Sequence, residues 1–409
     1  MSFKLLNLSS MYPGSLESFY LNNPDTENLS YDDHNSLLVN DTTEFAGSYT
    51  RNFRKAGIDT RCIISNDNNL QNKWKSENGL KSNKKSDILF EQINAFKPDI
   101  LWIEDLNSIN NEWFNNVRKK IKTINLIIAY HCAAYKKDLI EKLKNADFII
   151  TCTPGLKKSF ENEGLKTYLV YHGFDNELLT RVERNWNSSY NNLTFSGSLI
   201  TGGSFHNARI NLIENLLKEK IDLALYVNLD KSYRIKAKQL IYFLSGLLKK
   251  LKMERMIFQF PIFEYGQSQV KSYSDTLLRS NHSPLYGIDM YNLFRRSKIV
   301  LNIHTGVAGD YAGNMRMFEV TGVGSCLLTD NKKNLNDLFE VNKEVMVYNN
   351  PEDCIDKVKW LLEHEHEREE IARSGQRKTL EMHTVEKRCK SIIDIINKEL
   401  SLSERLKLS

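Results

Sequence analysis

The sequence predicts an α/β protein built from two parallel-sheet domains that face each other across a cleft. The chain has 409 residues, and one hydrophobic core rarely serves so many. Short apolar runs alternate with longer helical patterns, which is typical of βαβ units and a parallel sheet. An Asn/Ser-rich stretch interrupts this alternation. We therefore predict an N-terminal domain at 1–175, a linker at 176–192, a C-terminal domain at 193–385 and a last helix at 386–409 that could pack back on the first domain.

The predicted strands are too short for helices and often β-branched, and the spacing between neighbours leaves room for a helix. Ala56-Gly57 and Lys97-Pro98 supply helix ends before two of them. In the first domain the strands are expected at 3–8, 58–64, 98–103, 124–130, 147–151 and 167–172. In the second they are expected at 193–198, 221–227, 298–304, 325–330 and 344–348. In open parallel sheets, ligands bind outside the carboxyl ends of the strands, so the residues that follow these runs are the candidates for function.

Composition excludes several classes of function. The net charge is only +5, from 56 basic and 51 acidic residues, which argues against a nucleic-acid partner. The six cysteines form no CxxC pair and have irregular gaps, so neither a zinc site nor a disulfide framework is indicated, and free thiols in a reducing cytoplasm are expected. We find no signal peptide and no apolar run long enough to span a membrane. We expect a cytoplasmic protein that at most lies on a membrane surface.

The most informative stretch is GVAGDYAGNMRMFEVTGVGSCLLTD, residues 306–330. Clustered glycines cost backbone entropy, and close approach to a ligand is a common reason for them. Residues 314–321 predict a short helix whose N-terminus would favour an anion such as a diphosphate. Arg316 could pair with a phosphate, and Glu319 could accept hydrogen bonds from the hydroxyls of a ribose. The alternatives are a surface loop and a surface ion pair at helical spacing.

Two further strand ends of the second domain are candidates for the same site. Gly197 and Ser198 end one strand before a helix, where glycine lets a phosphate or sugar approach the backbone. This turn is not a GxGxxG fingerprint, which counts against a dehydrogenase that uses NAD. Asn302 and His304 lie on one side of another strand by its period of two. An ordinary turn and a structural histidine are the alternatives here.

The first domain offers groups for proton transfer and for an acceptor. Glu104 and Asp105 follow one apolar strand and His131 follows another, and each could act as a base. A helix cap for Asp105 and a buried hydrogen bond for His131 are the structural alternatives. Ser10 and Tyr12 precede a Pro-Gly turn that could cover a substrate. Tyr31 and His34 lie in a polar insert after the first helix, where Asp32-Asp33 has no partner cluster at metal-ligand spacing.

Several segments resemble bacterial glycosyltransferases of the GT-B architecture, of the CgeB-like "glycosyl transferases group 1" type. The most specific is AGDYAGNMRMFEVTGVGSCLLTD. It is accompanied by TFSGSL, HNARINLIENL, YGIDMYNLFRRSKIVLNIH, LNDLFEVNKEVMVY and SGQRKTLEMHTVEKR. YPGSLESFY and FKPDILWIEDL match less sharply, so that the resemblance covers most of the chain. It implies two Rossmann-like domains, with a nucleotide-sugar donor in the C-terminal domain and an acceptor against the N-terminal one.

The resemblance also assigns roles to residues. Glu319 matches the acidic residue that holds the donor ribose, and the 306–314 loop matches the diphosphate cradle. Many retaining members carry a second acidic residue eight positions earlier, where this chain has Tyr311, with Asp310 one step away. Both retention and inversion of the anomeric centre therefore remain open. The donor set that these segments imply is completed by Gly197, Ser198, Arg209, Tyr286, Gly287, Met290, Asn302, His304, Gly313, Asn314 and Arg316.

The sequence thus predicts a GT-B glycosyltransferase that uses a nucleotide-diphosphate sugar. No DxD motif is present, so we expect no metal and no cofactor, with the leaving diphosphate stabilised by a helix dipole and basic residues. The acceptor is expected to be a glycan, a lipid-linked glycan or a protein, in bacterial surface-glycan assembly or protein glycosylation. A nucleotide-sugar epimerase of the same fold and a non-catalytic nucleotide-sugar-binding protein are the alternatives.

Residues 231–255 could bring the protein to a membrane. Apolar side chains recur there at helical spacing, with lysines at both ends. An interfacial helix facing anionic lipid has this pattern, and so has a core helix of the second domain. We therefore keep open a peripheral contact at the inner face of the membrane.

Overall fold

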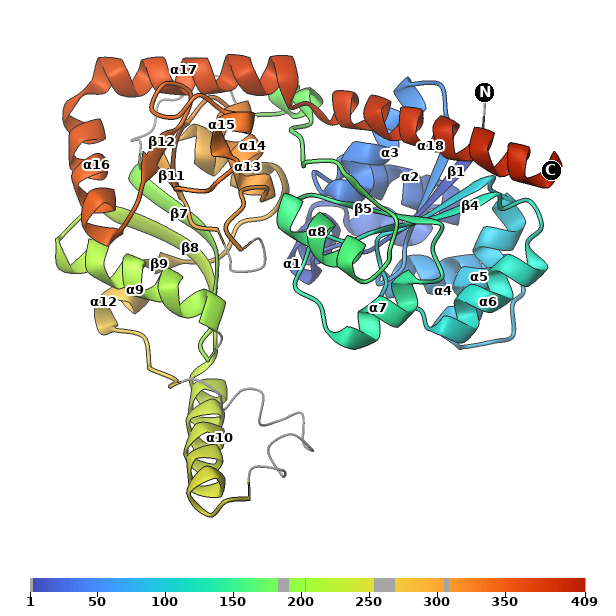
Figure 1. Ribbon diagram of the computed structural model, residues 1–409, viewed down its shortest axis with the longest axis horizontal. Coiled ribbons are helices and arrows are strands. Elements are labelled where there is room, and N and C mark those ends of the chain that lie inside the picture. The colour runs from blue at the N-terminus through green and yellow to red at the C-terminus, as the bar shows by residue number, and fades with distance from the viewer. Residues whose placement is uncertain (1–2, 183–190, 203, 254–268, 305–308, 409) are drawn as a thin grey trace.

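The N-terminal domain is a six-stranded parallel sheet with helices on both faces (Figure 1). The computed structural model describes residues 3–182, 191–202, 204–253, 269–304 and 309–408. The strand order of this sheet is β2-β1-β3-β4-β5-β6. Its strands are β1 (Lys4–Ser9), β2 (Asp59–Ile64), β3 (Ile100–Ile103), β4 (Leu126–Tyr130), β5 (Phe148–Thr151) and β6 (Thr167–Leu169). Its helices are α1 (Pro13–Asn22), α2 (Tyr31–Asp41), α3 (Phe45–Lys55), α4 (Asn68–Glu77), α5 (Lys85–Phe96), α6 (Asn111–Lys120), α7 (Lys137–Leu143) and α8 (Pro154–Asn162), with 3-10 turns η1 (Pro24–Asn28) and η2 (Asn176–Thr180).

The C-terminal domain repeats this architecture, with strand order β12-β11-β10-β7-β8-β9 and every pairing parallel. Its strands are β7 (Asn191–Leu199), β8 (Leu223–Leu229), β9 (Asn281–His282), β10 (Ser297–Asn302), β11 (Cys326–Asp330) and β12 (Met346–Tyr348). Its helices are α9 (Ser204–Lys218), α10 (Ser232–Lys250), α12 (Asp275–Ser280), α13 (Gly287–Arg295), α14 (Met315–Gly322), α15 (Leu335–Leu338), α16 (Pro351–Glu363) and α17 (Glu365–Met382). The predicted fold class is confirmed, and all eleven predicted strands are present. Among the strands of the described residues, the two-residue β9 is the one that was not predicted.

The two faces of the N-terminal sheet explain why its strands are apolar throughout. Leu101 and Ile127 pack in a core beneath α5, α6, α7 and α8. Their neighbours Trp102 and Ile128 point to the opposite face and join a second core, as the period of two in a strand requires. That second core is closed by α3 and by α18 (Val385–Leu408), the last helix of the chain.

The chain crosses between the domains twice, and the two crossings are hydrogen-bonded to each other. Phe174 donates its N–H to the carbonyl of His383 and accepts from the N–H of Val385, at 2.8 and 2.9 Å. A Cβ on Gly322 would lie 2.3 Å from the Phe174 ring, so the C-terminal domain also packs tightly on this crossing. Arg51 adds an ion pair of 2.6 Å to Asp175. These contacts form the hinge of the molecule.

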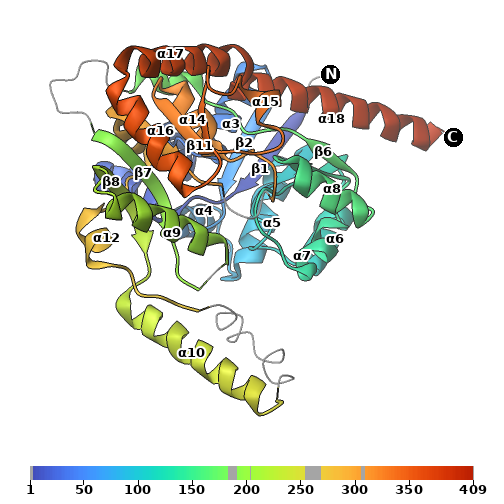
Figure 2. The same cartoon turned by 60° about the vertical axis from the view of Figure 1, so that its left-hand side comes forward.

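Helix α10 stands out from the body of the C-terminal domain (Figures 1 and 2). Only Ile235 and Ser245 of its residues are buried. Within the described segments, no helix has both the length and the apolar composition needed to cross a membrane.

Candidate active site

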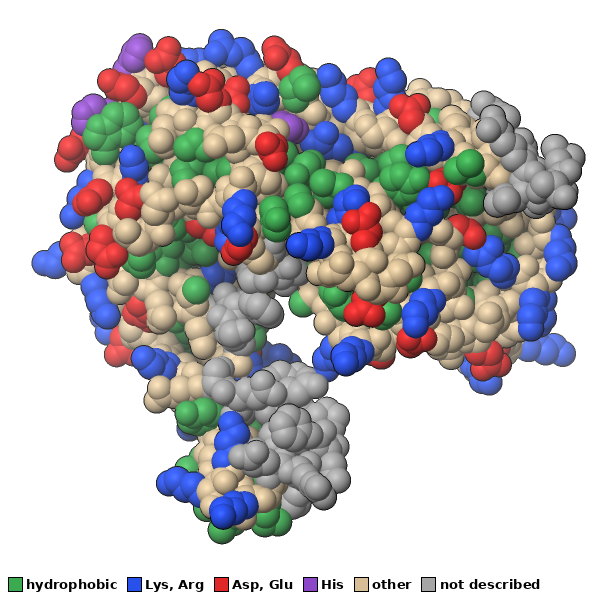
Figure 3. Space-filling model, viewed as in Figure 1, with side chains coloured by type: hydrophobic (Ala, Val, Ile, Leu, Met, Phe, Trp, Pro, Cys, Tyr) green, Lys and Arg blue, Asp and Glu red, His purple; other side chains and the backbone are tan. Residues whose placement is uncertain are grey.

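The molecule is hollowed between its two domains, on the side from which α10 projects (Figure 3). Two close contacts join the domains across this cleft. A Cβ on Gly14, after β1, would lie 2.3 Å from Cε2 of Tyr286, at the start of α13. A Cβ on Gly313, just before α14, would lie 2.6 Å from the carbonyl oxygen of Cys152, after β5. Glycine is needed at both positions because another backbone or a ring lies against it.

The start of α14 is built to leave backbone N–H groups available. Asn314 is the N-cap residue, but its side chain makes no capping hydrogen bond. Instead its Nδ2 donates to Oδ1 of Asn302 at 2.6 Å, at the end of β10. The first N–H groups of a helix have no partner within the helix, and together with the helix dipole they favour an anion. The predicted helix at 314–321 is therefore present, with the polarity that a diphosphate needs.

Glu319 lies one turn further along α14 and is buried at 7% exposure. Its Oε2 accepts from Nη1 of Arg316 at 2.8 Å, and its Oε1 accepts from the hydroxyl of Tyr291 at 3.4 Å. The guanidinium of Arg316 also lies over the ring of Phe294, 4.4 Å from its centroid. This is the ion pair at helical spacing that the sequence allowed, but it is buried and tied to α13 rather than lying at the surface. A carboxylate held this rigidly can accept further hydrogen bonds from a ligand.

The N-terminal domain brings a second carboxylate, that of Glu44, close enough to Glu319 for their charges to interact. The N–H of Tyr12 donates to Oε2 of Glu44 at 3.1 Å. Burial raises the pKa of Glu44 to about 7, and the charge of Glu319 adds to the rise. Carboxylates from both domains therefore influence each other at this place.

Comparison with known proteins gives one family match and several structures of similar fold. Residues 245–394 match the family described as "Glycosyl transferase-like". Among curated protein sequences, none matches the chain significantly. A glycosyltransferase from Rickettsia africae superposes with a TM-score of 0.56 at 11% identity, over 98% of each chain.

The chain has the GT-B glycosyltransferase fold. HepE from Anabaena, in a structure with UDP and glucose, gives a TM-score of 0.53 at 10% identity, over 97% of this chain and 100% of that one. An α-glucosyltransferase bound to UDP-glucose and DNA with an abasic site gives 0.56 at 13% identity, with the same coverage. The structural matches span both domains, and the family match lies in the C-terminal half of the chain. These matches do not test the CgeB-like subtype.

His304 is a buried residue that follows the end of β10. Its Nδ1 lies 2.6 Å from Oδ1 of Asp330, at the end of β11. Although burial alone would raise the pKa of Asp330, its hydrogen bonds with His304 hold that pKa below the usual value. Nε2 of His304 is buried and has no hydrogen-bond partner among the described residues. An unpaired buried nitrogen of this kind calls for a ligand or an unseen partner, and the adjoining 305–308 lies outside the described residues.

The other predicted donor residues lie on several elements of the C-terminal domain. Arg209 donates from Nε to the carbonyl of Ile303 at 3.0 Å, and burial lowers its pKa. Met290 lies against Arg316, with 3.1 Å between Sδ and Nη1. Asp310 is at the surface in an ion pair of 2.7 Å with Lys333. Gly197 and Ser198 lie near the end of strand β7, and Gly287 has a positive φ at the start of α13.

The three predicted bases differ in how they are held. Asp105 accepts from the hydroxyls of Ser65 and Ser108 and from the N–H groups of Asn107 and Ser108. Asp105 therefore holds the loop that follows β3 rather than capping a helix, because α6 begins only at Asn111 and is capped by Asn110. Glu104 accepts from the hydroxyl of Ser9, and burial raises its pKa to about 8.

His131 is held by the backbone that follows it. Its Nε2 lies 2.9 Å from the carbonyl oxygen of Ala133. Because a carbonyl only accepts, Nε2 carries the proton in the neutral ring and Nδ1 keeps its lone pair. Burial lowers the pKa of His131, which favours this neutral form.

The predicted acceptor residues fall into two groups. Ser10 and Tyr12 follow β1 beside the cleft, and Tyr12 is 67% exposed. Tyr31 and His34 are instead buried in the N-terminal domain, at 4% and 1% exposure. The hydroxyl of Tyr31 donates to Gln92, and His34 pairs with Tyr20. Neither is available to an acceptor in this conformation.

Glu44 is the cleft residue that the sequence analysis missed. It follows no predicted strand, and it is the N-cap residue of α3 although its side chain does not cap that helix. Its carboxylate is turned toward Tyr12 instead. A glutamate at an N-cap is unusual, because Ser, Thr, Asp and Asn are the preferred residues there. This unusual N-cap residue was the only local sign in the sequence that Glu44 has another role.

Proposed function

We propose that this protein transfers a sugar from a nucleoside-diphosphate sugar to an acceptor hydroxyl, in the assembly of a bacterial surface glycan or the glycosylation of a protein. The observation that carries the proposal is the buried carboxylate of Glu319, placed one turn from an uncapped helix N-terminus and facing the other domain. A nucleoside diphosphate has two matching parts. Its diphosphate suits the N-terminus of α14, and its ribose hydroxyls suit Glu319.

Uridine diphosphate sugars are the first donors to test. HepE has been seen with UDP and with UDP-glucose, and the α-glucosyltransferase with UDP-glucose. The sequence identity to each is low, so these structures support the choice of probe rather than a particular sugar.

In the proposed reaction, the acceptor oxygen forms a bond to the anomeric carbon as the bond to the diphosphate breaks. Negative charge then grows on the leaving diphosphate, where the dipole of α14 and the cations of Arg209 and Arg316 would stabilise it without a metal. The acceptor proton passes to a base on the N-terminal side, for which we propose His131. If the enzyme retains the anomeric configuration, His131 would contact the donor sugar instead.

A panel of nucleotide sugars in a thermal-shift assay tests the proposal. A donor at 100 times its dissociation constant should stabilise the protein by about 2.7 kcal/mol. Incubation with that donor alone then separates the alternatives, since an epimerase would convert the sugar without an acceptor. A protein that binds the donor but neither transfers nor hydrolyses it would be a binding protein. No stabilisation by any nucleotide sugar would contradict the proposal.

We further propose that the protein works at the cytoplasmic face of the membrane and is held there by α10. The helix leaves Leu240, Phe243 and Leu247 exposed on one side, and two lysines lie in its last turn. A lipid-linked acceptor would lie at that surface.

A further inference from the structure

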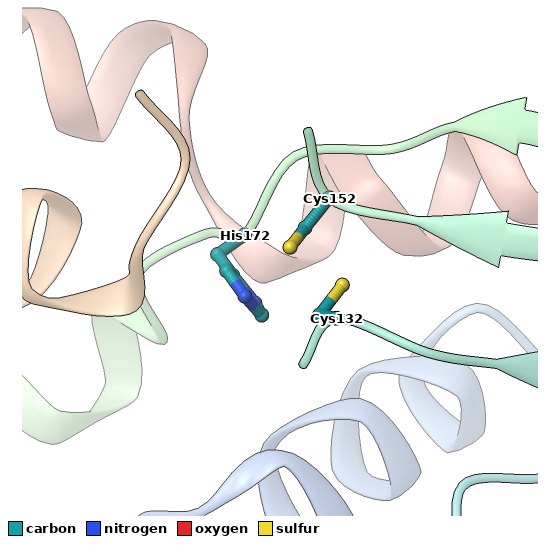
Figure 4. Close-up of side chains that lie close together, drawn as sticks. All are labelled: Cys132, Cys152 and His172. Carbon is teal, nitrogen blue, oxygen red and sulfur yellow. The ribbon is translucent and has the colours of Figure 1, made fainter. Parts of the chain in front are cut away.

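Cys132, Cys152 and His172 converge at one edge of the N-terminal sheet (Figure 4). They follow β4, β5 and β6, which are parallel neighbours in the sheet, so their positions after the strand ends coincide in space. One ligand atom from each lies within 4.8 Å of the other two. In the sequence the three residues stand twenty apart at each step. This spacing lacks the CxxC pattern by which zinc sites are usually recognised.

The donor set is that of a soft divalent metal ion. Two thiolates and one imidazole are ligands that Zn²⁺ takes in proteins. With Zn–S distances of about 2.3 Å and Zn–N distances of about 2.0 Å, tetrahedral ligand atoms lie about 3.5–3.8 Å apart. The limit of 4.8 Å on the separations in the structure is close to this range, so rotation of the side chains can bring the three ligand atoms around one ion.

One nitrogen of the imidazole already has a partner. The hydroxyl of Tyr130 lies 3.2 Å from Nδ1 of His172, so Nε2 is the nitrogen that we assign to the metal. Histidines that bind metals usually hold their other nitrogen in such a hydrogen bond. The backbone is fixed as well, because the carbonyl of His172 accepts from Nε of Arg388 at 3.0 Å. Cys152 and His172 are buried while Cys132 is half-buried, so an ion can reach the cluster past Cys132.

We propose that Cys132, Cys152 and His172 bind one Zn²⁺ ion that ties the ends of three strands together at the cleft. Binding forms two Zn–S bonds and one Zn–N bond, and the two thiol protons pass to solvent. The fourth tetrahedral position is left to a water molecule. An ion here would fix two neighbours of the cleft, because Cys132 adjoins His131 and the carbonyl oxygen of Cys152 lies close to Gly313. This inference does not depend on glycosyl transfer.

The test loads the full-length, reduced protein with Zn²⁺ alone after treatment with a chelator. Elemental analysis should find about one zinc per chain, and zinc should raise the melting temperature. Co²⁺ in its place should give the visible bands of a tetrahedral site and a thiolate charge-transfer band, which identify the ligands even if a variant folds poorly.

Four variants sharpen the result. Cys132→Ser and Cys152→Ser should each lose the bound zinc, while Cys354→Ser, at a buried cysteine on α16, should keep it. Tyr130→Phe should weaken zinc binding by about 10–100-fold, as loss of a second-shell partner usually does. Cobalt spectra without thiolate bands, or equal zinc in Cys132→Ser and wild type, would overturn the proposal. A Cys132–Cys152 disulfide with no zinc uptake after reduction would overturn it as well.

Discussion

Glu319 is the single residue on which the donor site depends most. Its carboxylate is buried and is held by Arg316 and Tyr291, so it is placed for a ligand before the ligand arrives. Glu319→Ala should weaken nucleotide-sugar binding by about 1.5–3 kcal/mol, the usual loss for a charged hydrogen bond. Calorimetric titration measures this. Glu340→Ala, at an exposed ion pair with Lys343, is the matched control, and an unchanged dissociation constant for Glu319→Ala would dismiss the assignment.

His131 is the residue that tests the chemistry. It is neutral near pH 7 because burial lowers its pKa, and Nδ1 can accept a proton. His131→Ala should reduce turnover by about 100-fold or more while donor affinity changes little. His364→Ala, at an exposed histidine stacked on Trp360, controls for loss of an imidazole elsewhere.

Turnover of His131→Ala within a few-fold of wild type would remove His131 from the mechanism. Asp105→Asn is a further variant, because the sequence predicts Asp105 as another base. The structure places Glu104→Gln and Glu44→Gln ahead of it, because the Asp105 carboxylate already accepts four hydrogen bonds and has little capacity left for a substrate.

Glu104 should make stability depend on pH. Burial raises its pKa from 4.5 to about 8, so between these values the folded protein binds more protons than the unfolded chain. Linkage then requires the free energy of unfolding to fall as the pH rises through this window. Glu104→Gln should reduce that slope, because an amide does not titrate, and Glu340→Gln should leave it unchanged. Denaturant unfolding at a series of pH values gives the slopes, and equal slopes for Glu104→Gln and wild type would contradict this.

Residues of the site were predictable where a short sequence motif determines their position. Glu319 and Arg316 share one helical turn after a glycine loop, so the local sequence is enough. Glu44 reaches the cleft only because α3 begins beside the loop that carries Tyr12. Cys132, Cys152 and His172 meet only because three strands align. These positions depend on packing between distant segments, which local patterns do not encode.

At the scale of elements, strands were predictable because a buried parallel strand is a short apolar run between polar turns. The helical pattern of α10 was predictable as well, but its surroundings were not, since the same apolar spacing fits a core helix and a surface helix. In the structure Phe243 is 67% exposed and Leu240 58%, so the described residues do not cover this face.

Helix α10 should bind anionic membranes. Its exposed apolar residues and its lysines would act together, and the electrostatic part should weaken with salt. We expect the protein to sediment with anionic vesicles at low salt, and replacement of Phe243 and Leu247 by Asp to release it. Leu402→Asp, an equally drastic change on α18, should leave binding intact. If wild type does not sediment, the membrane proposal fails and α10 must have another partner.

At the scale of the whole molecule, the two domains can cooperate only if they come together around the donor. The hinge at Phe174 and Val385 fixes one end of the cleft. The contacts of Gly14 with Tyr286 and of Gly313 with Cys152 define the closed position at the other. The C-terminal helix α18 contributes to this arrangement, because it begins in the hinge and packs on the N-terminal sheet.

Gly14→Ala should therefore impair catalysis by holding the domains apart. The new Cβ would lie 2.3 Å from the Tyr286 ring, so either the ring or the N-terminal domain must move. Misplacement of reacting groups by about 1 Å can cost about 100-fold in rate, and we expect a loss of that order in turnover with little change in melting temperature. Gly246→Ala, at a helical glycine with open space around it, is the control. Small-angle X-ray scattering with donor bound should show a larger radius of gyration for Gly14→Ala than for wild type. Unchanged turnover together with unchanged scattering would mean that this contact plays no part in closure.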